Sequence, residues 1–120
     1  AGTTGPTGPT GVPGTFSDAQ AINSRVTGYT LALADAGRLV TLEASAGTIS
    51  VVIPPSSSVA FPTGTHVDIA RLGNAAVIVT GATGVTVNAT PGRILRAQYS
   101  GGTMIQYAAN TWLLVGDLSS

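Results

Sequence analysis

The chain offers few side chains that could carry out chemistry, since it has one histidine and no cysteine. His66 and Asp68 lie two residues apart in an alternating stretch, so they would share one face of a strand. In an assembly of three copies, such a pair could bind a metal ion or an anion near the axis. We favour the simpler interpretation, a surface histidine that hydrogen-bonds to its neighbour, and we assign no metal site.

Five carboxylates could take part in acid–base chemistry: Asp18, Asp35, Glu43, Asp68 and Asp117. Glycoside hydrolysis needs two carboxyl groups that flank one bond. No spacing singles out such a pair, because Asp35 belongs to a turn sequence and Asp117 lies close to the C-terminal end. We therefore expect a protein that is not an enzyme and has neither a catalytic residue nor a cofactor.

Aromatic side chains suggest a second kind of site, because an exposed ring can stack on the apolar face of a sugar. Tyr99 and Tyr107 are the candidates for contact with a glycan. Trp112 stands beside Leu113 and Leu114 in an apolar stretch. We predict that Trp112 and Leu114 anchor the core or a subunit interface, since few aromatic residues are available to fill either.

Glycine occupies every third position at the start of the chain, and this pattern concerns assembly. The glycines are Gly2, Gly5, Gly8, Gly11 and Gly14, and prolines occupy X or Y positions of three of the triplets. A collagen helix winds three chains together, and only glycine fits at its crowded axis. Residues 1–15 are therefore predicted to form a short triple-helical stalk in a homotrimer. The alternative is a flexible linker, which needs no register.

Strands and turns alternate after the stalk. Residues 16–28 are expected to form a junction, in which Ser17 or Asp18 could cap a short helical turn. Residues 29–120 are expected to form a β-rich trimeric head with about nine short strands. The expected strands are 29–33, 38–43, 48–53, 65–71, 76–80, 84–88, 93–98, 103–107 and 111–115. A β-helix would show a short repeat of fixed period, and the sequence has none. We therefore predict an all-β, antiparallel sandwich or jelly roll built from sequential hairpins.

Charged residues make up only 8% of the chain and the formal net charge is zero, whereas ordinary soluble domains are about 25% charged. A nucleic-acid partner would need a basic surface, so we expect none. No apolar run is long enough to span a bilayer, so we expect no membrane insertion. Such low charge suits faces that are buried in an oligomer. The chain opens on Ala1 in a Gly-X-Y context, and we expect it to be a fragment of a longer fibrous protein.

Four stretches, together with the stalk, carry a resemblance to a known family. They are 29–40, 61–64, 84–88 and 112–117. The chain resembles, over nearly its whole length, the C-terminal heads of tailed-bacteriophage fibre and minor tail proteins, including collagen-like head or capsid fibres. The shared motifs are structural: turn glycines, strand valines and a closing strand with tryptophan.

This resemblance implies a homotrimeric β head at the end of a fibre in the virion, with other virion proteins as partners. The implied role is adhesion to bacterial surface glycans, in which three weak contacts act together. The alternative is a capsid or tail decoration fibre with a purely structural role. A glycan depolymerase ranks third. No catalytic residue carries over, because the matching positions are not chemical ones.

Overall fold

The computed structural model describes residues 19–120. The stalk glycines (Gly2, Gly5, Gly8, Gly11 and Gly14) and the candidate caps Ser17 and Asp18 lie outside the described residues. Within that range the chain is all-β, as predicted, with eleven strands and one three-residue 3-10 helix, η1 (Leu33–Asp35). The strands are β1 (Ile22–Arg25), β2 (Tyr29–Thr30), β3 (Leu39–Leu42), β4 (Thr48–Ile53), β5 (His66–Arg71), β6 (Ala76–Gly81), β7 (Thr86–Asn88), β8 (Ile94–Leu95), β9 (Gly101–Ala108), β10 (Thr111–Gly116) and β11 (Leu118–Ser119).

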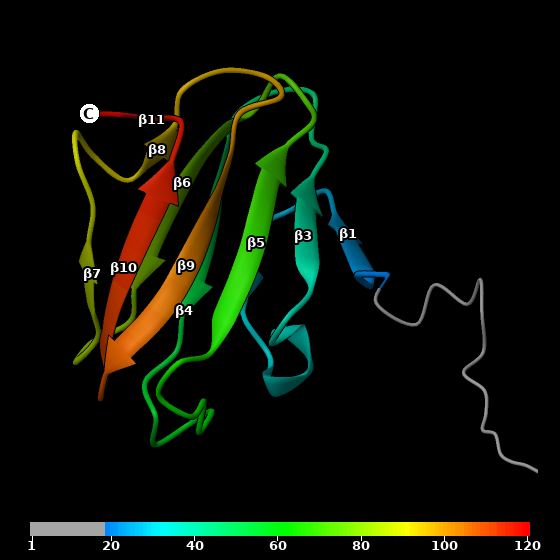
Figure 1. The fold of residues 1–120 in the computed structure, drawn as a ribbon. Coiled ribbons are helices and arrows are strands. Elements are labelled where there is room, and N and C mark those ends of the chain that lie inside the picture. The colour runs from blue at the N-terminus through cyan, green and yellow to red at the C-terminus, as the bar shows by residue number, and fades with distance from the viewer. Residues whose placement is uncertain (1–18) are drawn as a thin grey trace, which may run out of the picture.

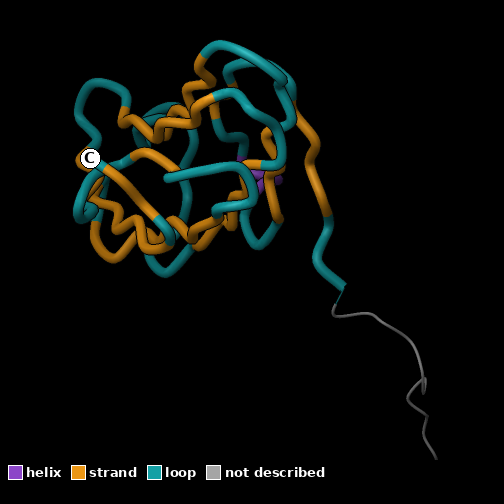
Figure 2. Tube along the Cα trace, turned by 90° about the horizontal axis from the view of Figure 1, so that it is seen from above, coloured by secondary structure: helices purple, strands orange, loops and turns teal. Residues whose placement is uncertain are grey.

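The strands form two sheets that face each other across the core (Figure 1). The six-stranded sheet has the order β1-β3-β5-β9-β10-β7, and the five-stranded sheet has the order β11-β8-β6-β4-β2. Figure 2 looks along the layers and shows strands on both sides of the interior. In both views the described chain begins at the β1 side of the head and ends at the opposite side.

The first six strands wind as a parallel coil, and the prediction of antiparallel sequential hairpins is wrong for this half. The chain passes from one sheet to the other after each strand, so β1, β3 and β5 pair in parallel, as do β2, β4 and β6. Alternation of apolar and polar residues fixes the two faces of a strand but does not choose its partner. Successive turns of this coil differ in length, because Ile22 pairs with Leu39 whereas Leu39 pairs with Asp68. The sequence therefore shows no fixed period.

The antiparallel pairing is confined to the C-terminal half. Strand β9 pairs with β5 and with β10, and β8 pairs with β6 and with β11. Among the described strands, β9 and β10 are the one consecutive pair that forms a hairpin. The two sheets are therefore mixed, and the antiparallel strands complete a sandwich that begins as a coil.

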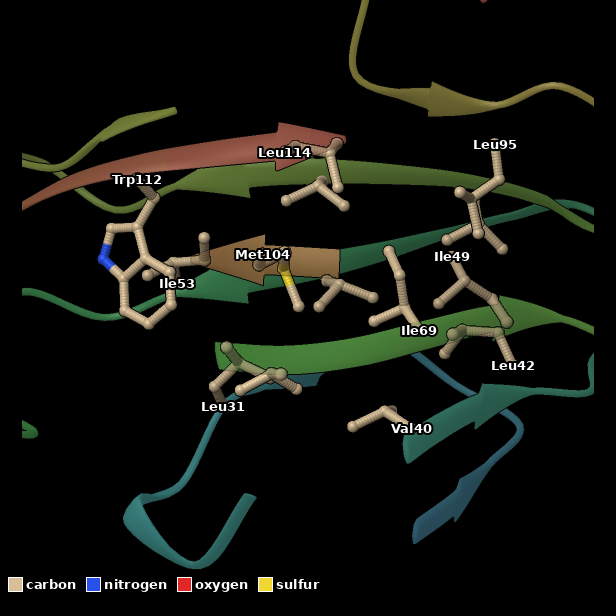
Figure 3. Packing of buried hydrophobic residues seen from close by; sticks show 14 of the residues in the cluster. Leu31, Val40, Leu42, Ile49, Ile53, Ile69, Leu95, Met104, Trp112 and Leu114 are labelled. Carbon is tan, nitrogen blue, oxygen red and sulfur yellow. The ribbon is translucent and has the colours of Figure 1, made fainter. Parts of the chain in front are cut away.

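The core is built from columns of β-branched and leucine side chains between the two sheets (Figure 3). In β4 and β6, Ile49 pairs with Val77 and Val51 with Val79, and all four side chains are buried. Parallel strands stack like residues directly on one another, which suits Val and Ile on a pleated surface. The fold is thus held by burial of apolar area along these columns.

The segment predicted as a junction contains a strand. Residues 22–25 form β1, which pairs in parallel with β3 at the edge of the six-stranded sheet. Its apolar residue, Ile22, is exposed, whereas the polar Asn23 is half-buried and bonds to Asp35. This pattern is the reverse of that of a typical half-buried strand, and it explains why alternation did not indicate β1.

Candidate functional site

Trp112 and Leu114 lie in the core between the sheets, where both are buried (Figure 3). The ring of Phe61 meets the Trp112 ring edge-on, with centroids 5.5 Å apart and an interplanar angle of 86°. The buried Gln106 side chain donates a hydrogen bond of 2.7 Å to the Phe61 carbonyl oxygen and so fixes the loop that carries this ring. Trp112 packs within one chain and is not available to a ligand.

Tyr99 occupies the loop between β8 and β9 and is 75% exposed. Its φ of 72° lies in the left-handed region, which is uncommon for a residue with a bulky side chain. The backbone N–H of Tyr99 donates a hydrogen bond to the Arg71 carbonyl oxygen, which holds this conformation against the end of β5. The ring is therefore presented to solvent by a turn that is fixed in place.

Tyr107 lies near the other end of β9 and is 52% exposed. Its hydroxyl oxygen accepts a hydrogen bond of 2.8 Å from the Asn88 amide on β7. Most of the length of β9 separates Tyr107 from Tyr99, and a strand of this length spans more than about 20 Å. Tyr99 and Tyr107 therefore do not form a single aromatic site.

A hollow of about 500 Å³ opens where β7 and β10 diverge. Strand β7 ends at Asn88, whereas β10 continues to Gly116, so the last part of β10 has no strand partner on that side. The residues that line the hollow are Asn88, Ala89, Thr90, Leu113, Leu114, Val115 and Gly116. The volume lies in the range of small-molecule sites, but no acidic or basic side chain of the described residues lines it.

His66 and Asp68 lie on the outer face of β5, as the alternation predicted, but they share no hydrogen bond. The Asp68 carboxylate accepts hydrogen bonds of 2.6 Å from the Thr103 hydroxyl and 2.6 Å from the Gln20 amide. Partial burial acts to raise the pKa of Asp68, and these two bonds, with a smaller contribution from His66, outweigh it and lower the pKa. Among residues 19–120, no cluster of three or more His, Asp or Glu side chains could hold a metal ion.

Two other carboxylates also accept hydrogen bonds from partners distant in the sequence. Glu43 accepts bonds from the hydroxyls of Ser24 and Thr41, at 2.6 and 2.8 Å, and these bonds lower its pKa. Asp117 forms a bidentate ion pair with Arg96 and accepts a hydrogen bond of 2.7 Å from the Ser100 hydroxyl. The Arg96 bond contributes most to lowering the pKa of Asp117.

Among the described residues, Asp35 is the least exposed polar side chain, and the sequence indicated it only as a turn residue. Its buried carboxylate accepts hydrogen bonds from the Tyr29 hydroxyl, the Asn23 amide and the backbone N–H of Ala32. Burial raises the pKa of Tyr29, and the hydrogen bond to Asp35 raises it further. The cluster joins β1, β2 and η1, and its saturated hydrogen bonds indicate a structural role. The one sequence signal for this cluster is that Tyr29 and Asp35 lie six residues apart, next to a turn.

Comparison with known proteins gave no match to a family model, a curated protein or a solved structure. Across residues 19–120, no helix has the length and apolar character needed to cross a membrane.

Proposed function

We propose that this chain is the head of a trimeric, collagen-stalked fibre in a bacteriophage virion, and that its primary role is structural. The observation that carries this proposal is the run of five Gly-X-Y triplets in register, followed within a few residues by a β domain. A triple helix requires three chains. Ordering five triplets costs backbone entropy, and so short a triple helix forms few contacts that offset this cost. In this proposal the head therefore sets the register of the three chains.

The placement of the aromatic residues favours a structural role over a dedicated receptor site. An adhesive tip that stacks sugars would gather exposed rings in one place. Here Trp112 is buried, and Tyr99 and Tyr107 lie near opposite ends of β9. The hollow beside β10 has no acid pair, which a depolymerase would need.

Adhesion to a bacterial surface glycan is the second candidate, and Tyr99 favours it. An exposed aromatic ring on a backbone held in the left-handed region is a kind of feature that occurs at binding sites. Three such rings in a trimer would act together, so that weak individual contacts give firm attachment. Tyr99→Ala should abolish binding to an array of bacterial surface polysaccharides if this role is present. Leu33→Ala, at another exposed large side chain, serves as the control.

The solution mass by light scattering tests the proposed function. The full chain and a shorter chain that begins at Thr15 are compared at the same concentration. A trimer in both supports a head that associates by itself. A trimer only in the full chain would show that residues 1–14 hold the copies together, and a monomer in both would overturn the proposal.

A further inference from the structure

One row of side chains crosses the outer face of the six-stranded sheet. The pairing places Ile22 beside Leu39, Leu39 beside Asp68, Asp68 beside Thr103 and Thr103 beside Val115. Directly paired residues point to the same side of a sheet. On each of the four inner strands an adjacent residue is buried in the core, namely Val40, Ile69, Met104 and Leu114. This outer row (Ile22, Leu39, Asp68, Thr103 and Val115) therefore faces away from the core.

The two ends of the outer row are apolar and exposed, whereas its middle is polar and already satisfied. Ile22 is 64% exposed at one end and Val115 is 44% exposed at the other, where Tyr107 and Leu113 extend the apolar surface. In the middle, Asp68 accepts hydrogen bonds from Thr103 and Gln20. Four strand spacings separate the two ends, a distance of about 19 Å. They are therefore two separate apolar surfaces.

The chain that leads to the stalk leaves the head on this same face. The Gln20 side chain reaches across β3 to Asp68 on β5 and also donates to the Gly37 carbonyl oxygen, at 3.2 Å. Gln20 lies six positions after Gly14, the last stalk glycine. At full extension these six steps span at most about 22 Å. In a trimer the Ile22 end of each copy is therefore held close to the common axis and to the outer faces of its neighbours.

We infer that the Ile22 end of one copy packs on the surface formed by Tyr107, Leu113 and Val115 of the next copy. This inference rests on the proposed trimer and names the surfaces that form it. Contacts in a three-fold ring are heterologous, so each copy must offer two different complementary surfaces. The outer row provides two such surfaces, both apolar, on the face toward which the stalk emerges.

The test uses the full chain and three single variants, with solution mass as the readout. Ile22→Arg and Val115→Glu should each reduce the trimer to monomer, because each buries a charge against an apolar surface. Leu33→Arg is the matched control, since Leu33 is an exposed leucine (56%) on η1, outside the outer row. This control should remain trimeric. The fluorescence of Trp112, the one tryptophan, reports whether each variant keeps its core.

The double variant Ile22→Arg with Val115→Glu decides whether the two ends meet each other. Opposite charges then face one another across every subunit contact, and the trimer should return. A trimer in either single variant would overturn the inference while leaving the proposed function intact, as would a double variant that stays monomeric with a native core. A wild-type monomer would instead show that the proposed trimer itself is wrong.

Discussion

At the scale of single residues, each of the four carboxylate side chains that the structure describes accepts hydrogen bonds from other parts of the chain. Asp35 is the clearest case, since a buried charge is tolerated only when hydrogen bonds replace its lost hydration. Three donors from three different segments meet it there. The cluster fixes the edge strands β1 and β2 relative to η1, and these strands have few other partners.

Asp35→Asn should lower the free energy of unfolding by about 2 kcal/mol, because the amide group leaves one of the three donors facing another donor. The measurement is urea unfolding at fixed protein concentration, followed by Trp112 fluorescence. Asp117→Asn is the matched control. Asp117 is about half-exposed in its ion pair with Arg96, and exposed ion pairs contribute little to stability, so this variant should lose clearly less than Asp35→Asn. Equal losses in the two variants would contradict the structural role of Asp35.

Trp112→Ala should cost about 3–5 kcal/mol, since it leaves a cavity beside Phe61 that the surrounding strands cannot fill. Thermal unfolding followed by circular dichroism measures this loss. Tyr107→Ala removes an exposed ring and should change the stability of the separated monomer far less. A Trp112→Ala protein that melts like the wild type would show that this ring is not part of the core.

At the scale of elements, the sequence predicted where strands occur better than how they pair. All nine expected strands overlap an observed strand, because β-branched residues alternate between turn glycines and prolines. Strands β1 and β11 gave no such signal. Strand β1 turns the polar Asn23 inward, and β11 contributes a single buried residue, Leu118, so neither shows an apolar alternation. Partner choice depends on the connections between the two sheets. The apolar neighbours of Trp112 in the sequence were enough to predict that it is buried. The Asp35 cluster could not be predicted in this way, because its hydrogen-bond partners come from three separate segments.

The coil also requires close contact between the loops that follow β3 and β5. A Cβ on Gly73 would lie 2.0 Å from the Ala44 carbonyl oxygen, so only glycine fits at this crossing. The N–H groups of Leu72 and Gly73 donate to the Leu42 carbonyl oxygen and draw the two loops together. The spacing of these two turns of the coil therefore depends on one missing side chain.

Gly73→Ala should push the two loops apart and cost about 1–3 kcal/mol, as other overpacked sites do. Gly28→Ala is the matched control, because its Cβ would meet the Ser50 carbonyl oxygen at an ordinary 3.5 Å. Both variants are compared by urea unfolding at one protein concentration. The coil geometry would be contradicted if the two substitutions had the same effect.

At the scale of the whole molecule, few charges are present, and several of them join segments that are distant in the sequence. Glu43 bonds to Ser24 on β1, Asp68 to Thr103 on β9 and Asp117 to Arg96 after β8. Low charge leaves little repulsion within the head and leaves its outer faces available for association. The acid sensitivity of the protein should therefore arise from these few bonds.

The contribution of these carboxylates to stability should be constant above about pH 5 and should fall below about pH 4. The pKa values of Glu43, Asp68 and Asp117 are lowered in the folded state. The unfolded chain therefore takes up protons first, and the stabilisation is lost as the pH falls through the folded values. Melting temperatures across this range measure the effect. Thr103→Val should reduce the acid-dependent part, because it removes a donor to Asp68. If Thr103→Val and the wild type lose the same amount of melting temperature in acid, the hydrogen bond to Asp68 is not a source of the acid sensitivity.

The order of strands in the two sheets has a consequence for the direction of assembly. The parallel half of the six-stranded sheet ends at β5, whose free side is covered by β9, and that of the five-stranded sheet ends at β6, covered by β8. Both covering strands follow all six strands of the parallel coil in the sequence, so they are synthesised after them. The β9–β10 hairpin is the local pairing, and it forms faster than pairings between distant segments. The two sheets are therefore complete only after these C-terminal strands of the head have been synthesised. In the proposed trimer, the collagen helix then winds from the head back toward the N-terminus, against the direction of translation.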